Sequence, residues 1–129
     1  MTTMMSSWLL KAAFWLPLLF CTWMALAPQP PKIPGLDLAD TVLHALAFSY
    51  LAFTLMLAYA NRSALQAFVA LLGYGVFIEL VQSQQIERTA EWKDLGVDVA
   101  GIVIGLTLAR YAAVPVRNLV EKLTSRVSA

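Results

Sequence analysis

Four long apolar stretches dominate this sequence and determine its fold class. They cover about residues 8–27, 41–60, 64–82 and 95–114. A helix needs roughly 20 apolar residues to cross the hydrocarbon layer of a bilayer, and each stretch approaches that length. Segments of this length satisfy their own backbone hydrogen bonds in lipid only as helices. The sequence therefore predicts an all-α membrane protein, a bundle of four transmembrane helices.

The composition supports a membrane protein and argues against several other classes. Of the 129 residues, 60% are hydrophobic and 13% are charged, whereas soluble domains are about half apolar and about a quarter charged. So short a chain leaves no room for a second core, and residues 1–129 are expected to form one domain. The net charge of +1 argues against nucleic-acid binding. Cys21 is the single cysteine, so a structural zinc site of the usual kind is excluded, and we expect no cofactor or metal.

The first stretch has a second interpretation as a cleaved signal peptide, because Ala25-Leu26-Ala27 resembles an A-x-A cleavage site. Its apolar part is long for a signal peptide, and Lys11 lies several residues inside it. Pro28 would directly follow the scissile bond, where proline generally blocks signal peptidase. These features favour a retained helix.

The basic residues predict the orientation. With four spans, the N-terminus, the turn after the second stretch and the C-terminal tail share one side of the membrane. The basic residues on that side are Lys11, Arg62, Arg110, Arg117, Lys122 and Arg126, and those on the other side are Lys32, Arg88 and Lys93. The positive-inside rule therefore predicts cytoplasmic termini in a multi-pass protein of the cytoplasmic (inner) membrane. The tail after Val114 is expected to continue as an amphipathic surface helix.

Seven of the eight carboxylates gather at the opposite end of the predicted bundle, together with the single histidine. Helical spacing places the polar residues of each stretch on one shared face. The set comprises Asp40 and His44 in the second stretch, Gly75, Glu79 and Gln82 in the third, Arg88 in the following loop, and Asp94 and Asp98 in the fourth. Gly101 and Gly105 extend the last face as a GxxxG step, which allows a neighbouring helix to approach closely. We therefore expect one ligand-binding site, shared by three helices at headgroup depth.

A purely structural role is the alternative for these residues. Ionisable side chains inside a bilayer cost a few kcal/mol each, so they should face one another or a wet cavity. Asp40 and Asp94 could cap helix N-termini. Asp98 could form an interhelical hydrogen bond or ion pair, and Glu79 could pair with His44 or Arg88 as a structural tie. Glu79, His44 and Asp98 form the core of the predicted site.

The same residues form a familiar ordered pattern between about Asp40 and Ala109. It reads Asp40-x-x-x-His44, Gly75-x-x-x-Glu79-x-x-Gln82, Arg88, and Asp94-x-x-x-Asp98-x-x-Gly101-x-x-x-Gly105. This pattern resembles the VanZ-like family, small membrane proteins named after an accessory protein for teicoplanin resistance. Two departures are an aspartate at position 98, where the family often has asparagine, and a loop after Gln82 without the usual Pro-Gly turn. The resemblance implies a bacterial cell-envelope membrane protein linked to glycopeptide tolerance, and it implies no particular reaction.

Three functions follow from these residues. The favoured one is an accessory or binding protein that acts on lipid-linked or glycan components of the envelope, with Arg88 for an anionic headgroup and carboxylates for sugars or amines. The second is an intramembrane hydrolase or transferase on lipid phosphates, with His44 as general base oriented by Asp40 and with Glu79 as acid. In a metal-dependent form of this enzyme, Asp40, His44, Glu79 and Asp98 would bind a divalent metal. The third is a proton-coupled carrier, which would need a homo-oligomer because four helices give little room for alternating access. No serine or cysteine is placed as a nucleophile, so we expect a binding protein whose partners are membrane lipids.

Overall fold

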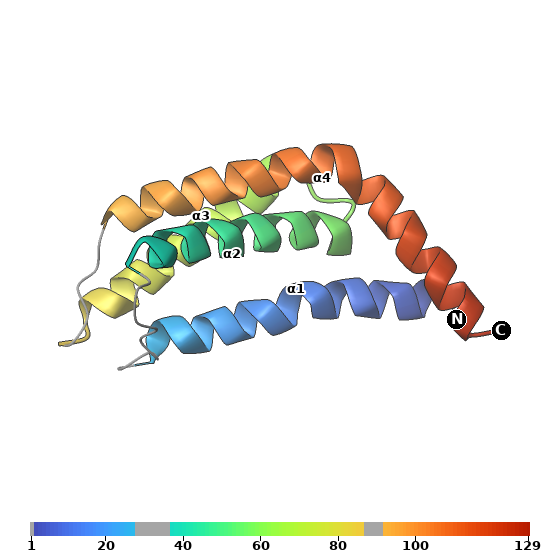
Figure 1. Ribbon diagram of the computed structural model, residues 1–129, viewed down its shortest axis with the longest axis horizontal. Coiled ribbons are helices and arrows are strands. Elements are labelled where there is room, and N and C mark those ends of the chain that lie inside the picture. Colours follow the sequence, from blue (N-terminus) through green and yellow to red (C-terminus); the bar gives the residue numbers. More distant parts are fainter. Residues whose placement is uncertain (1, 28–36, 87–91) are drawn as a thin grey trace.

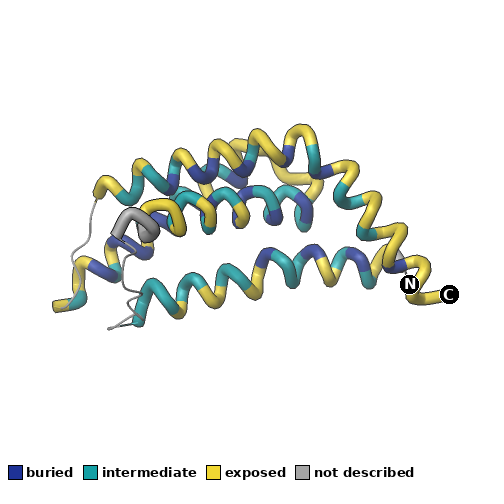
Figure 2. Tube along the Cα trace, in the orientation of Figure 1, coloured by how far each residue is buried: buried dark blue, intermediate teal, exposed yellow. Residues whose placement is uncertain are grey.

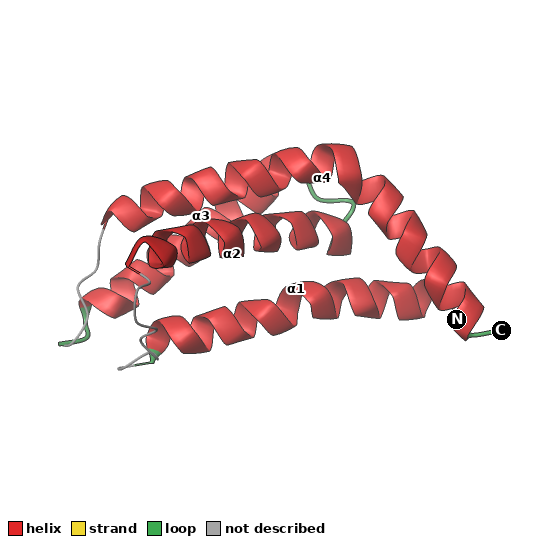
Figure 3. Ribbon diagram, in the orientation of Figure 1, coloured by secondary structure: helices red, strands yellow, loops and turns green. Residues whose placement is uncertain are grey.

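The computed structural model describes residues 2–27, 37–86 and 92–129, and these residues form helices with no strand among them (Figures 1 and 3). The helices are α1 (Thr2–Leu26), α2 (Asp37–Ala58), α3 (Ala64–Ser83) and α4 (Trp92–Val127). Each of the four is long and apolar enough to cross a membrane. The prediction of an all-α bundle with four transmembrane helices is confirmed.

The two ends of the bundle differ in what they hold. Both termini and the α2–α3 turn lie at one end, which we call the termini end (Figure 1). At the other end, here the site end, α1 and α3 finish while α2 and α4 begin. Consequently α2 and α4 run parallel to each other, and residues equally far from their starts lie at similar depth.

Glycines on α4 allow α2 and α4 to meet backbone to backbone, and this is the most extensive contact among the described helices. A Cβ added to Gly101 would lie 2.6 Å from the carbonyl oxygen of Ala45 and 3.1 Å from the Cβ of Phe48. A Cβ added to Gly105 would collide with the carbonyl of Ser49. These carbonyls belong to the backbone of α2 and cannot turn aside as a side chain could. The close approach predicted from the GxxxG step is confirmed.

Polar contacts attach α1 to the helices beside it. The Tyr50 hydroxyl of α2 donates to the Ala13 carbonyl at 2.7 Å, and the hydroxyls of Thr22 and Tyr74 lie 2.8 Å apart between α1 and α3. Phe14 of α1 also belongs to the buried apolar cluster of the bundle. Interhelical hydrogen bonds contribute strongly here because lipid removes the hydrophobic drive for helices to associate. α1 thus packs as a member of the bundle.

Many large apolar side chains remain exposed on the outer surface of the bundle (Figure 2). Examples are Leu16, Leu19, Phe20, Leu65 and Leu108, each more than half exposed. So much exposed apolar surface would be a liability in water, whereas lipid tails solvate it without penalty. The arrangement agrees with a multi-pass membrane protein.

The helix bounds differ from the sequence prediction mainly in α4. The span predicted to end at Val114 and the helix expected in the tail form one continuous helix, because α4 continues through Pro115 to Val127. Proline removes a backbone hydrogen bond and bends a helix without always ending it, and α4 bends in this region so that its last part crosses the termini end (Figure 1).

The start of α3 is fixed by a capping box, which Ser63 and Gln66 form through their spacing of three residues.

The α2–α4 contact gives a direct test of this packing. Gly105→Ala is expected to lower the free energy of unfolding by about 1–3 kcal/mol, because the new methyl group has no space against Ser49. Gly96→Ala is the matched control on the same helix, since a Cβ there meets nothing within 4 Å; it should be neutral or stabilising by up to about 1 kcal/mol. Unfolding of both variants in detergent micelles measures the difference. Equal stability of the two variants would contradict the backbone contact.

Candidate functional site

His44 and Asp98 form a pair across the α2–α4 contact at the site end. The Nδ1 atom of His44 lies 3.3 Å from Oδ1 of Asp98, so an Nδ1–H donates a long hydrogen bond to the carboxylate. The Asp98 side chain is 3% exposed and the His44 side chain 29% exposed. The carboxylate is therefore enclosed, while the imidazole lies between it and the surroundings of the bundle.

The Asp98 carboxylate fits because α3 carries a glycine opposite it. A Cβ on Gly75 would lie 3.0 Å from Oδ2 of Asp98 and 3.5 Å from the ring of Phe48. Phe48 is one helical turn deeper than His44 on α2, it is buried, and it belongs to the apolar cluster with Leu51 and Ile102. The Phe48 ring thus separates the His44–Asp98 pair from the apolar interior of the bundle.

Glu79 is the second enclosed carboxylate of the site end. It is 2% exposed and follows Gly75 by four residues on α3, so both lie on the same face of that helix. The structure thereby brings the predicted core residues Glu79, His44 and Asp98 to adjoining faces of three helices. Carboxylate oxygens accept hydrogen bonds and the imidazole can donate or accept one, so these side chains suit a ligand that offers hydrogen-bond donors.

Gln82 is buried, as a site residue would be, but the structure also gives it a structural contact. Its Nε2 donates to the Ala25 carbonyl at 2.9 Å, and the Nε2 of Gln85 donates to the Leu26 carbonyl at 3.0 Å. Both carbonyls belong to the last turn of α1, where no intrahelical partner exists for them. The two glutamines therefore cap α1. Gln85 was not singled out from the sequence, although its spacing of three residues from Gln82 is the signal that could have identified it.

Of the other predicted site residues, Asp94 lies at the edge of the described site, and the side chains of Asp40 and Arg88 lie outside the described part of the structure. Asp94 is half-buried in the first turn of α4, where a carboxylate is favoured by the helix dipole. Asp40 lies on α2, one turn before His44, but its side chain is outside the described part of the structure. Arg88 is also outside the described residues.

The described site can accept hydrogen bonds and can transfer protons. A histidine whose Nδ1–H is directed at a carboxylate presents Nε2 as its proton acceptor, which is the arrangement of a general base oriented by a second residue. Within the described ranges, no three His, Cys, Asp or Glu side chains are grouped closely enough to hold a metal ion.

Comparison with known proteins identifies the family. A model of the VanZ/LLP1 family matches residues 3–114, which include all four predicted spans and every predicted site residue. This chain is therefore a member of the VanZ/LLP1 family, and the resemblance seen in the sequence pattern is confirmed. Comparisons with curated proteins and with solved structures found no match.

The single histidine makes the His44–Asp98 contact measurable by ¹⁵N NMR. The neutral ring should carry its proton on Nδ1, because the Asp98 carboxylate accepts from that atom. Asp98→Leu removes the acceptor and should shift the proton toward Nε2, whereas Thr107→Ala, an exposed position farther along α4, should leave the tautomer unchanged. An identical ring spectrum in the wild type and in Asp98→Leu would show that the contact does not hold the proton.

Proposed function

We propose that this member of the VanZ/LLP1 family binds the polar headgroup of a lipid-linked cell-envelope component at its site end. The protein would act as a binding or accessory component for that lipid-linked molecule. The family name, which refers to teicoplanin resistance, connects this role with glycopeptide tolerance.

One observation carries the proposal: Glu79 and Asp98 are both almost fully enclosed, and His44 connects Asp98 to the less buried edge of the bundle. Enclosed carboxylates are costly unless hydrogen-bond donors or charges compensate them. Sugar hydroxyls and amines supply such donors, and both groups occur in lipid-linked glycans. His44 and Asp98 lie about two turns inside the starts of α2 and α4, and Glu79 lies about one turn inside the end of α3, so a group that extends inward from the headgroup layer reaches them.

The distribution of basic residues supports an outward-facing site. Arg62, Arg110, Arg117, Lys122 and Arg126 all lie toward the termini end of the described structure. By the positive-inside rule this end faces the cytoplasm, and the site end then faces the outer leaflet of the cytoplasmic membrane. Envelope precursors carried on lipids reach that leaflet when they are used outside the cell.

A second function is favoured by the geometry of the His44–Asp98 pair, which matches a base and its orienting carboxylate. In that case the protein would hydrolyse or transfer a lipid phosphate, with Glu79 as acid. Asp98 would orient His44 in addition to Asp40, to which the sequence assigns the same role. Turnover of a polyprenyl phosphate by the purified protein, lost in His44→Gln, would establish this alternative and replace the binding role.

Variants without the carboxylates test the binding role. Glu79→Gln removes one charge and keeps the shape of the side chain, and Asp98→Ala removes the other carboxylate, so each should weaken binding of a polyprenyl-diphosphate-linked sugar by at least about tenfold. Gln84→Ala is the control, because Gln84 is exposed just beyond the same end of α3. Native mass spectrometry of the purified protein measures retention of the lipid, and growth with teicoplanin measures the phenotype. Full binding and full tolerance in both charge variants would rule out the proposal.

Cysteine labelling tests the orientation. Cys21→Ala removes the native thiol, after which Gln84→Cys and Ser128→Cys each place one exposed cysteine at the site end and the termini end, respectively. In intact cells, a membrane-impermeant maleimide should label Gln84→Cys and should reach Ser128→Cys only after the membrane is permeabilised. The opposite labelling pattern would place the site in the cytoplasm.

A further inference from the structure

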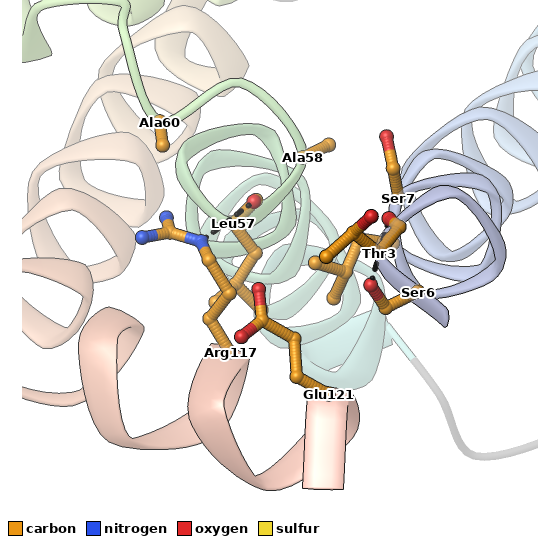
Figure 4. Close-up of a pocket in the computed structure, with 9 residues that line it drawn as sticks. Thr3, Ser6, Ser7, Leu57, Ala58, Ala60, Arg117 and Glu121 are labelled. Atoms are coloured by element: carbon orange, nitrogen blue, oxygen red, sulfur yellow. Dashed lines mark hydrogen bonds between the residues drawn. The ribbon is translucent and has the colours of Figure 1, made fainter. Parts of the chain in front are cut away.

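A pocket at the termini end lies far from the carboxylate site. It has a volume of about 140 Å³ and is formed by the start of α1, the end of α2 and the part of α4 that follows Pro115 (Figure 4). A water molecule occupies roughly 30 Å³ in the liquid, so the pocket can hold a group the size of several waters. The hydroxyl residues of α1 lie on one side of the space, and Arg117 and Glu121 of α4 lie on the other (Figure 4).

Arg117 contributes a positive charge to this pocket. Its Nη2 donates to the Met56 carbonyl at 3.1 Å, and its Nε donates to the Leu57 carbonyl at 3.4 Å. Both acceptors are neutral carbonyls near the C-terminus of α2, so the guanidinium keeps its net charge while it caps that helix. A guanidinium has five N–H groups, and among the described residues the other three donate to no protein acceptor. Arg117 is thus fixed in place and can still bind an anion.

The start of α1 adds further groups that suit an anion. Thr3 and Ser7 line the pocket from the first two turns of this helix. Helix N-termini favour anions because their first backbone N–H groups lack intrahelical acceptors. Ser6 also lines the pocket, and its hydroxyl donates to the Thr3 carbonyl at 3.0 Å, which leaves the Ser6 oxygen as an acceptor. Phosphate oxygens match the donors, and an ammonium group matches such an acceptor.

Glu121 adds a negative charge to the pocket, which then contains charged groups of both signs. Its carboxylate follows Arg117 by one helical turn on α4 and lines the same space (Figure 4). A simple anion would be repelled by Glu121, whereas a zwitterion would place its negative group at Arg117 and its positive group at Glu121. The same part of α4 exposes Leu119 and Leu123 beside the basic Lys122. This combination is typical of a helix in the headgroup layer of a membrane.

From these contacts we propose that the pocket binds the headgroup of an aminophospholipid from the leaflet at the termini end. The phosphate lies at Arg117 and the hydroxyls of α1, and the primary ammonium lies at Glu121 and the Ser6 oxygen. Binding there ties the start of α1 and the last part of α4 to the end of α2. The inference is independent of the proposed function, because it concerns the opposite end of the bundle.

Native mass spectrometry of the full chain in detergent tests this site with two added lipids, short-chain phosphatidylethanolamine and phosphatidylglycerol. The wild type should retain phosphatidylethanolamine preferentially. Arg117→Gln should weaken retention of both lipids by about tenfold, as expected for loss of a charge-assisted hydrogen bond. Glu121→Gln should lower retention of phosphatidylethanolamine several-fold without lowering that of phosphatidylglycerol. Arg62→Gln is the matched control, since Arg62 is an exposed arginine at the same end that does not line the pocket.

Glu121→Gln keeps the test valid if Arg117→Gln loosens the end of α2, because Glu121 is exposed and its exchange removes only a surface charge. An unchanged lipid preference in Glu121→Gln would overturn the proposal, and so would equal losses in Arg62→Gln and Arg117→Gln. Competition by free phosphoethanolamine as effective as that by the lipid would assign the pocket to a soluble phosphate ester and overturn the lipid headgroup as its occupant.

Discussion

The close contact between α2 and α4 is the constraint on which the rest of the structure depends. Gly101 and Gly105 bring the two backbones together, and the parallel course of the helices turns this proximity into a fixed register. The register places His44 against Asp98, one turn nearer the site end than Gly101. A side chain at either glycine would push the helices apart and lengthen a hydrogen bond that is already long at 3.3 Å. Packing and site geometry are therefore consequences of the same contact.

The surrounding lipid explains why polar groups hold so much of the bundle together. Apolar faces gain little by leaving lipid for one another, so close backbone packing and hydrogen bonds carry the association of the helices. Gln82 and Gln85 cap the end of α1 at the site end, and Arg117 caps α2 at the termini end. Glu79 and Asp98 differ from these residues because they are carboxylates enclosed within the bundle.

Much of the fold can be predicted from the sequence, because span length and backbone satisfaction in lipid leave few alternatives. Helical phase also predicts that Glu79, His44 and Asp98 face the interior of the bundle, and the burial of Glu79 and Asp98 agrees with this. The contact between His44 and Asp98 cannot be predicted in this way, because it joins two helices and depends on the offset between α2 and α4. The length of α4 is hidden for a similar reason, since Pro115 can end a helix or bend it, and tertiary contacts decide which occurs. The contact of Gln82 with α1 likewise depends on where α1 ends.

We propose that the enclosed carboxylates and the histidine form a binding site rather than a closed structural tie. The two cases differ in what lies between Glu79, His44 and Asp98 in a bilayer. A structure determined at high resolution in lipid nanodiscs prepared from envelope lipids tests this most directly. For a binding site we expect density for a polar headgroup that contacts the His44 ring and at least one of the two carboxylates. Side chains that close on one another, with no space or density between them, would contradict it.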